Sequence, residues 1–264
     1  MEHSPKPFSK LILPTADVAR ATTGHNSYAI RNYYGKGPVA AGKRQRFLKA
    51  LHLGANFKTD SVIDMGTADG IFLPTLSVNY GRVVAIDADS QFVDYATQLV
   101  NAMALANVEL ICNQEISFTE LAQRIGPGFG LMYLLETLEH VGCQPDIWSS
   151  KADFLHRCFT LLEDSGGIVV SVPKMVGPAL LFKTLVQRAL GLAPEEMSWR
   201  ELLGSSLMYK TDDLERRWQG GHVGFNHRKL EDITFRHFRV EKRAQSLISV
   251  FYLLRRKPSS QIRS

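Results

Sequence analysis

Short apolar runs rich in β-branched residues alternate with longer segments of helical periodicity between residues 58 and 173. The runs are SVIDMG, RVVAIDAD, NVELIC, GLMYLLE and GGIVVSVP. Continuous apolar runs of this length are typical of strands buried on both faces of a parallel sheet. Their alternation with helices predicts a doubly wound α/β sheet, which binds its ligand at the carboxyl ends of the central strands.

Helical periodicity fills the intervals between the apolar runs. Apolar residues recur at helical spacing over Arg44–Leu53, Gln91–Ala106 and Trp148–Leu162, so each segment is predicted to be a helix. The segment IFLPTLSVNYG also favours a helix, because Pro74 falls in the first turn, where proline is tolerated.

The alternation stops after Pro173 and resumes near residue 222. There a helical signal, HRKLEDITF, precedes two further runs, FRVEKRA and ISVFYLLRR, whose close spacing predicts an antiparallel hairpin. The expected fold is therefore a doubly wound, mostly parallel, seven-stranded Rossmann-like sheet with an antiparallel C-terminal hairpin. The predicted divisions are an N-terminal helical segment or lid (1–57), an α/β core (58–173), a substrate-cap insertion (174–221), and a helix and hairpin completing the same domain (222–264).

Composition sets limits on the class of protein. The 264 residues carry a net charge of +5, which permits an anionic partner without requiring one. Three cysteines argue against a disulfide framework and for a reducing compartment. No run approaches the roughly 18 apolar residues of a membrane span, so we expect a cytoplasmic protein. No His or Cys cluster has metal-ligand spacing in the sequence, so we expect no metal site.

The turn after the first apolar run, VIDMGTADG, differs from a dinucleotide-binding loop. A dinucleotide fingerprint has the form G-x-G-x-x-G, which lets a pyrophosphate approach bare backbone. Here Ala68 stands where the middle glycine would be, and Asp64 and Asp69 flank the turn. Two like charges about 4 Å apart repel by roughly 4 kcal/mol at an effective dielectric of 20. The turn therefore favours a neutral or cationic ligand.

A further carboxylate, Asp87, supports a nucleoside ligand. Asp87 ends the run RVVAIDAD, from where a carboxylate can accept hydrogen bonds from both ribose hydroxyls. The sequence thus predicts an adenosine site without a phosphate site. S-adenosylmethionine fits, because its ribose suits Asp87 and its ammonium and sulfonium suit the acidic turn.

These motifs resemble those of the class I S-adenosylmethionine-dependent methyltransferases, over Asp60–Pro173 and more loosely beyond. In that family the first motif reaches the methionine ammonium. The resemblance therefore implies that Asp64 binds the ammonium and that Gly66 and Gly70 permit close approach, with Ala68 as a small departure. It also implies that Asp87 binds the ribose.

The resemblance implies further cofactor contacts. Ala88 would lie against the adenine face, while Asn113, followed by Gln114, stands where the family often has Asp for the adenine amino group. YLLETLEHV is similar to the family segment E-x-L-E-H-V, found in the branch acting on small molecules, lipids and glycans. It implies Glu136 beside the cofactor and His140 near the transferred methyl.

An acceptor hydroxyl must lose its proton, and histidine has the ordinary pKa best matched to that task. We therefore predict an O-methyltransferase with His140 or His222 as general base. The expected role of Glu139 is to cap or solvate a helix start. His227 is expected to be an ordinary helix N-terminal residue capped by Asn226.

The acceptor is the least determined part of the prediction. GPALLFKTLVQRALGL places Leu181, Leu185, Ala189 and Leu192 on one helical face, which either packs on the domain or contacts a membrane surface or an acyl chain. RNYYGKG could add aromatic and cationic groups to the pocket. The alternatives are N- or C-methylation of a small metabolite or quinone precursor, and a non-catalytic or RNA-binding protein of the same fold. A nucleic-acid partner is not expected, and a homodimer is left open.

Overall fold

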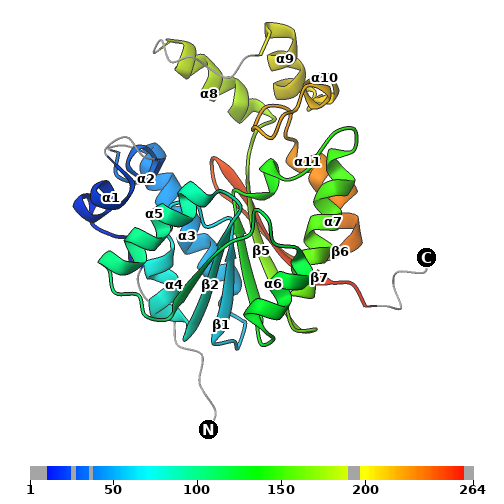
Figure 1. Cartoon of the computed structure of the whole chain (residues 1–264). Coiled ribbons are helices and arrows are strands. Elements are labelled where there is room, and N and C mark those ends of the chain that lie inside the picture. The colour runs from blue at the N-terminus through cyan, green and yellow to red at the C-terminus, as the bar shows by residue number, and fades with distance from the viewer. Residues whose placement is uncertain (1–10, 25–27, 36–37, 190–196, 259–264) are drawn as a thin grey trace.

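Seven strands form the sheet that organises the molecule (Figure 1). They are β1 (Ser61–Met65), β2 (Arg82–Asp87), β3 (Val108–Cys112), β4 (Leu131–Leu135), β5 (Gly167–Pro173), β6 (Phe238–Gln245) and β7 (Ser249–Arg256). The computed structural model describes residues 11–24, 28–35, 38–189 and 197–258. The strand order is β3-β2-β1-β4-β5-β7-β6; β1 to β5 are parallel, and β7 pairs antiparallel with β5 and β6. The predicted sheet and hairpin are confirmed.

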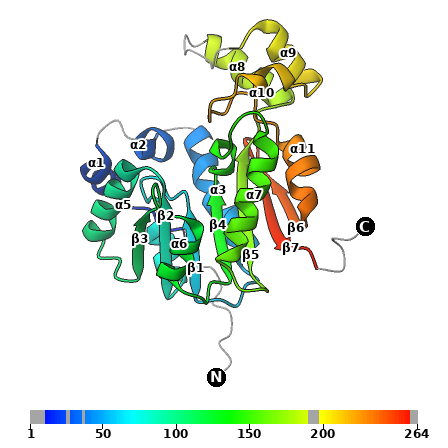
Figure 2. The same ribbon diagram turned by 45° about the vertical axis from the view of Figure 1, so that its right-hand side comes forward.

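Helices cover both faces of the sheet (Figures 1 and 2). One face packs on α1 (Ala16–Thr23), α2 (Tyr28–Tyr33), α3 (Pro38–Gly54), α4 (Leu73–Asn79) and α5 (Ser90–Ala102). The other packs on α6 (Phe118–Ile125), α7 (Ile147–Thr160), α11 (His227–Lys229), and the short turns η2 (Leu230–Thr234) and η3 (Phe235–His237). Neighbouring residues of a strand enter different cores: Val62 belongs to the first and Ile63 to the second. Burial on both faces explains the continuous apolar runs.

Most predicted helices are present with shifted ends. The helix expected over Gln91–Ala106 ends at Ala102, and Ala104 has a left-handed backbone with φ of 51° that does not continue a helix. The helix α6 lies in a stretch for which we made no prediction. It begins with a capping box in which Ser117 and Glu120 satisfy each other's backbone N–H groups.

A group of helices inserted after β5 lies beyond the carboxyl end of that strand (Figures 1 and 2). It consists of α8 (Pro178–Ala189), α9 (Trp199–Leu207) and α10 (Asp212–Arg216), which we call the cap. α8 packs against α9, and apolar side chains from all three helices extend the hydrophobic core on the α7 side of the sheet. The cap stands at the edge of the sheet where the predicted ligand site lies.

The face of α8 that packs inward differs from the expected one. Leu180 and Thr184 are each 2% exposed, whereas Leu185 is 43% exposed. Leu181 is half-buried against the core. Of the other residues of the predicted face, Leu192 lies outside the described residues, as does the side chain of Ala189.

The segment after the cap returns the chain to the sheet as predicted. Asn226 caps α11 by accepting a hydrogen bond from the backbone N–H of Arg228, so His227 begins a helix. None of the helices in the described part of the chain has both the length and the apolar character needed to cross a bilayer.

Candidate active site

A cavity of about 610 Å³ opens at the carboxyl ends of β1, β2 and β4, within the size range of small-molecule sites. The turn after β1 forms one part of its wall and the segment after β4 another. Sequence-predicted residues that line it are Asp64, Gly66, Ala68, Asp87, Ala88, Asn113, Glu136, His140 and His222. Gly70 and Gln114 are not among its lining residues, and the Gln114 side chain is exposed.

The turn after β1 requires a glycine at its start. Gly66 has φ of 79°, and a Cβ atom there would lie 2.2 Å from Oγ1 of Thr137. Its N–H donates to the Ile86 carbonyl at 2.8 Å. Ala68 also has a left-handed backbone, with φ of 49°, so it carries a modest strain that glycine would avoid. The turn is thus held closely against β2 and the segment after β4.

Two buried carboxylates belong to this turn. Asp64 is 4% exposed and accepts a hydrogen bond from Oγ1 of Thr67 at 2.8 Å. Burial raises the pKa of Asp64 to about 7 and that of Asp69 to about 6. Oδ2 of Asp69 accepts the backbone N–H of Ala29 at 2.9 Å, so this side chain also ties α2 to the turn. A cation beside Asp64 would favour its ionised form.

Asp87 links the turn to the end of β2. Its Oδ2 accepts the N–H of Ala68 at 2.8 Å, and its Oδ1 accepts the N–H of Asp89 at 3.0 Å. A carboxylate has about four acceptor positions. The two backbone hydrogen bonds occupy two of them, so Asp87 can still accept hydrogen bonds from hydroxyl groups in the cavity.

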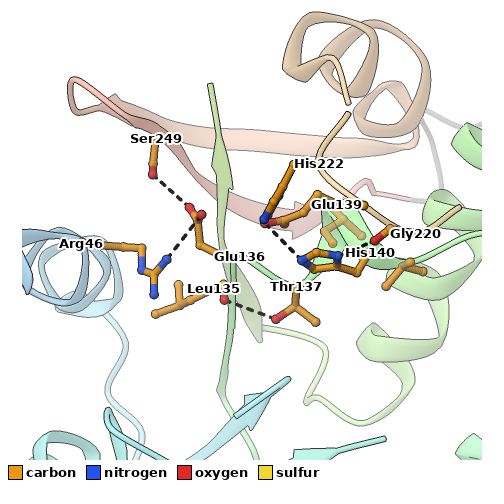
Figure 3. A network of polar contacts seen from close by, with 12 residues as sticks. Arg46, Leu135, Glu136, Thr137, Glu139, His140, Gly220, His222 and Ser249 are labelled. Carbon is orange, nitrogen blue, oxygen red and sulfur yellow. Dashed lines mark hydrogen bonds and ion pairs between the residues drawn. The ribbon is translucent and has the colours of Figure 1, made fainter. Parts of the chain in front are cut away.

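The segment after β4 begins with an ion pair that the sequence did not indicate. Glu136 has φ of 55° and lies 3.4 Å from a guanidinium nitrogen of Arg46, which comes from α3 (Figure 3). Ser249 donates its hydroxyl to Glu136 at 2.9 Å. Tyr33, from the predicted RNYYGKG segment, lines the cavity, whereas Lys36 lies outside the described residues. Two distant segments, α3 and β7, therefore orient one glutamate.

The short helix η1 (Leu138–His140) carries a second glutamate into the interior. Our expectation that Glu139 caps or solvates a helix start is wrong, because its side chain is fully buried. Neither of its carboxylate oxygens has a hydrogen-bond partner among the described residues. Burial, together with the charge of Glu136, raises the pKa of Glu139 well above its usual range.

Two histidines adjoin Glu139 (Figure 3). Oε1 of Glu139 lies 3.9 Å from Nε2 of His140 and 3.8 Å from Nδ1 of His222, which comes from the loop after α10. Nδ1 of His140 is 2.5 Å from the Gly220 carbonyl. Burial, with the nearby charges of His140, Lys183 and Lys43, lowers the pKa of His222 to about 4. The structure thus brings together both predicted histidines.

A buried lysine holds the turn that carries these groups. Lys151, on α7, donates through Nζ to the carbonyls of Leu138 at 2.9 Å and Glu139 at 3.2 Å, and also to that of Val141. Burial lowers the pKa of Lys151 to about 7. In the sequence Lys151 is one polar residue of an amphipathic helix, so only the tertiary contacts identify its role.

One protein-family model covers most of the chain. A model of the methyltransferase domain family matches residues 39–230. No curated protein matches the chain.

Solved structures share the fold at low sequence identity. The N-methyltransferase NodS from Bradyrhizobium japonicum WM9, in complex with S-adenosyl-L-homocysteine, is 13% identical with a TM-score of 0.53, over 92% of this chain and 97% of NodS. A protein from Pyrococcus horikoshii OT3 is 14% identical with a TM-score of 0.57, over 87% and 96% of the two chains. A S-adenosylmethionine-dependent methyltransferase from Clostridium acetobutylicum ATCC 824 is 11% identical with a TM-score of 0.51, over 80% and 90%.

Proposed function

The chain belongs to the methyltransferase domain family, and from that premise we propose that it transfers the methyl group of S-adenosylmethionine to a hydroxyl of a small-molecule, glycan or lipid-linked acceptor. The observation that carries this proposal is the division of the cavity. Buried carboxylates occupy the end beside β1 and β2, and two imidazoles occupy the end beside η1.

The cofactor is proposed to lie along the carboxylates. We propose that Asp64 binds the methionine ammonium and that Asp87 accepts hydrogen bonds from the ribose hydroxyls, which the acceptor positions left over from its two backbone hydrogen bonds support. Ala88 and Asn113, which line the same wall, would contact the adenine. The absence of a side chain at Gly66 lets the turn pack closely against Thr137, and we propose that the backbone of this turn contacts the bound cofactor.

The leaving group of the reaction needs little stabilisation from the protein. The acceptor oxygen attacks the methyl carbon, the carbon–sulfur bond breaks, and its electron pair remains on sulfur, which becomes neutral. Catalysis therefore rests on positioning and on removing the hydroxyl proton. We propose that His140 or His222, which both line the cavity, receives that proton.

Variants of the two histidines test this assignment. His140→Ala and His222→Ala are expected to reduce methyl transfer at saturating cofactor by about 100-fold or more, with the Kd for S-adenosylmethionine nearly unchanged. Transfer is measured with labelled cofactor over a panel of hydroxyl, amine and carbon acceptors. Unchanged turnover in both variants would remove the two histidines from the mechanism.

Exposed apolar side chains on the cap support the proposal of an acceptor with an apolar part. Its outer surface exposes large apolar side chains, with Phe182 at 72% and Trp199 at 54% exposure. Others on α8, on α9 and at its end are Leu185, Val186, Leu203, Leu207 and Met208. We propose that this surface contacts a membrane that presents a lipid-linked acceptor.

A flotation experiment with anionic liposomes tests the proposed membrane contact. Phe182→Asp and Leu185→Asp should reduce the bound fraction, because a charge replaces apolar surface at the interface. Val78→Asp is the matched control, since Val78 is 53% exposed on α4, a helix on the opposite side of the sheet from the cap's core. Equal flotation of all variants, or none by the wild type, would contradict membrane contact and leave methyl transfer to water-soluble acceptors.

A further inference from the structure

Three metal-ligating side chains converge at the imidazole end of the cavity (Figure 3). One ligand atom each from Glu139, His140 and His222 lies within 4.8 Å of the other two. The distances from Glu139 Oε1 to the two ring nitrogens are 3.9 and 3.8 Å. Neighbouring ligand atoms around a tetrahedral ion are about 3.4 Å apart at bond lengths of about 2.1 Å. The two histidine side chains are 46% and 39% exposed, so small rotations can close the gap.

The carboxylate of Glu139 lacks the hydrogen-bond donors that a buried carboxylate needs. It is fully buried, and both oxygens are without a hydrogen-bond partner in the described part of the chain. Keeping this carboxylate ionised without a partner would cost several kcal/mol, which is why its pKa is raised. The charges of Arg46 and Lys151 favour the ionised form of Glu139, but Arg46 forms an ion pair with Glu136 and Lys151 donates to backbone carbonyls. A bound cation would supply the missing partner.

Each histidine has a ring nitrogen within 3.9 Å of the same Glu139 oxygen. The Gly220 carbonyl can only accept, so Nδ1 of His140 carries the proton and Nε2, on the Glu139 side, has the free lone pair. Metal-ligating histidines usually donate their other ring N–H in this way. Nδ1 of His222 is buried and has no hydrogen-bond partner among the described residues.

We propose that Glu139, His140 and His222 bind one divalent transition-metal ion. Two imidazoles and one carboxylate form a mixed nitrogen and oxygen set that favours Mn²⁺, Fe²⁺, Co²⁺ or Zn²⁺ over Ca²⁺ and Mg²⁺. The linear sequence did not reveal this group, because α7, β5 and the cap separate His222 from the other two ligands.

The role of the ion rests on the proposed function. His140 and His222 also line the cavity, so an ion between them is accessible to an acceptor hydroxyl. Coordination lowers the pKa of the hydroxyl, and its proton leaves to solvent water. The oxygen then forms the new bond to the methyl carbon while the carbon–sulfur bond breaks. In this arrangement the two histidines hold the ion, and the ion takes over the task assigned above to an imidazole base.

Metal titration of the full chain tests the site without any acceptor. Protein freed of metal by a chelator and dialysed is titrated with Mn²⁺, Zn²⁺ and Mg²⁺ by calorimetry, and bound Mn²⁺ is followed by electron paramagnetic resonance. The wild type should bind one equivalent of Mn²⁺ or Zn²⁺. Glu139→Gln and His222→Ala should each weaken binding at least tenfold.

The controls separate this site from other histidines and from misfolding. His156→Ala removes one ring of a different histidine pair, His156 and His237, and should leave the stoichiometry unchanged. Each variant must retain wild-type affinity for S-adenosylmethionine, and Mn²⁺ should raise the Tm of the wild type but not of Glu139→Gln. Failure of the wild type to bind these ions, or equal binding by Glu139→Gln and His222→Ala, would overturn the proposal.

Activity measurements then separate the metal site from the proposed function. With an accepted substrate, chelation should reduce turnover and Mn²⁺ should restore it. Full turnover after complete removal of metal would overturn the catalytic role of the ion while leaving methyl transfer intact. If no acceptor is methylated, the titration still decides whether the site binds metal.

Discussion

The two ends of the cavity differ in how their carboxylates are satisfied. At the β1 and β2 end, Asp64, Asp69 and Asp87 each accept at least one hydrogen bond from a hydroxyl or backbone N–H. At the η1 end, Glu139 is fully buried, and its oxygens have no such donor among the described residues. The first end is organised by the chain itself, whereas the second is organised around a group that the chain does not supply.

The strongest test of the organised end is Gly66→Ala. The Cβ atom would lie 2.2 Å from the Thr137 hydroxyl at a φ of 79°. Left-handed strain and overpacking together should lower the free energy of unfolding by about 2–5 kcal/mol and abolish cofactor binding. Gly128→Ala is the control, since Gly128 has φ of 101° and no described atom within 4 Å of its Cβ position. If urea denaturation shows equal losses of unfolding free energy in Gly66→Ala and Gly128→Ala, the close packing of Gly66 against Thr137 is refuted.

The variant Lys151→Met tests the η1 end of the cavity. It leaves the carbonyls of Leu138, Glu139 and Val141 without their donor, which should cost about 2–4 kcal/mol of unfolding free energy. The turn that carries Glu139 and His140 should loosen, so turnover should fall far more than cofactor affinity. Calorimetric Kd values and methyl-transfer rates check this, with the exposed Lys58→Met as control. Parallel losses of both quantities would show that the two ends are not independent.

The raised pKa of Asp64 predicts a pH dependence confined to the cofactor end. A cationic ligand needs the ionised carboxylate, whose pKa is about 7 in the empty site. The Kd for S-adenosylmethionine should therefore rise as pH falls below 7, approaching about tenfold per pH unit. Asp64→Asn should bind more weakly and give a flatter profile between pH 5 and 7. A wild-type Kd that is constant over this range would contradict the assignment.

The raised pKa values of Asp64 and Asp69 give the stability of the ligand-free protein the opposite pH dependence: it falls as pH rises. Burial favours the protonated forms of Asp64 and Asp69, so their contribution to stability is fully present below the ordinary pKa of 3.8. It is lost as pH rises through about 6 and 7. Urea denaturation at pH 5 and pH 8 should show this loss in the wild type and a smaller one in Asp64→Asn.

The smallest expected effect is that of Ala68→Gly. Glycine would relieve the left-handed strain at φ of 49°, of about 1–2 kcal/mol, but it would lose about 0.5–1 kcal/mol through backbone entropy. The net change should be a gain in unfolding free energy of between zero and about 1.5 kcal/mol. A clear loss in urea denaturation would indicate that the Ala68 methyl group packs against the turn.

Local patterns were enough to predict that Asp64 and Asp87 meet at one edge of the sheet, where both line the cavity. Asp64 and Asp87 directly follow buried apolar residues in neighbouring strands, and parallel strands end at the same edge. The side chains that support Glu136 were not predictable in this way. Arg46 and Ser249 come from α3 and β7, far from Glu136 in the sequence, and no short-range pattern links them.

The sheet, its hairpin and the segments at the edge where the cavity forms could all be predicted from the sequence, because they depend on hydrophobic period and on turns of a few residues. The character of the imidazole end depends instead on contacts between distant segments. Glu139 is fully buried, and His222 reaches it because the chain returns from the cap beside η1. Burial and unpaired charge depend on which distant segments meet, and the linear spacing of residues does not encode that.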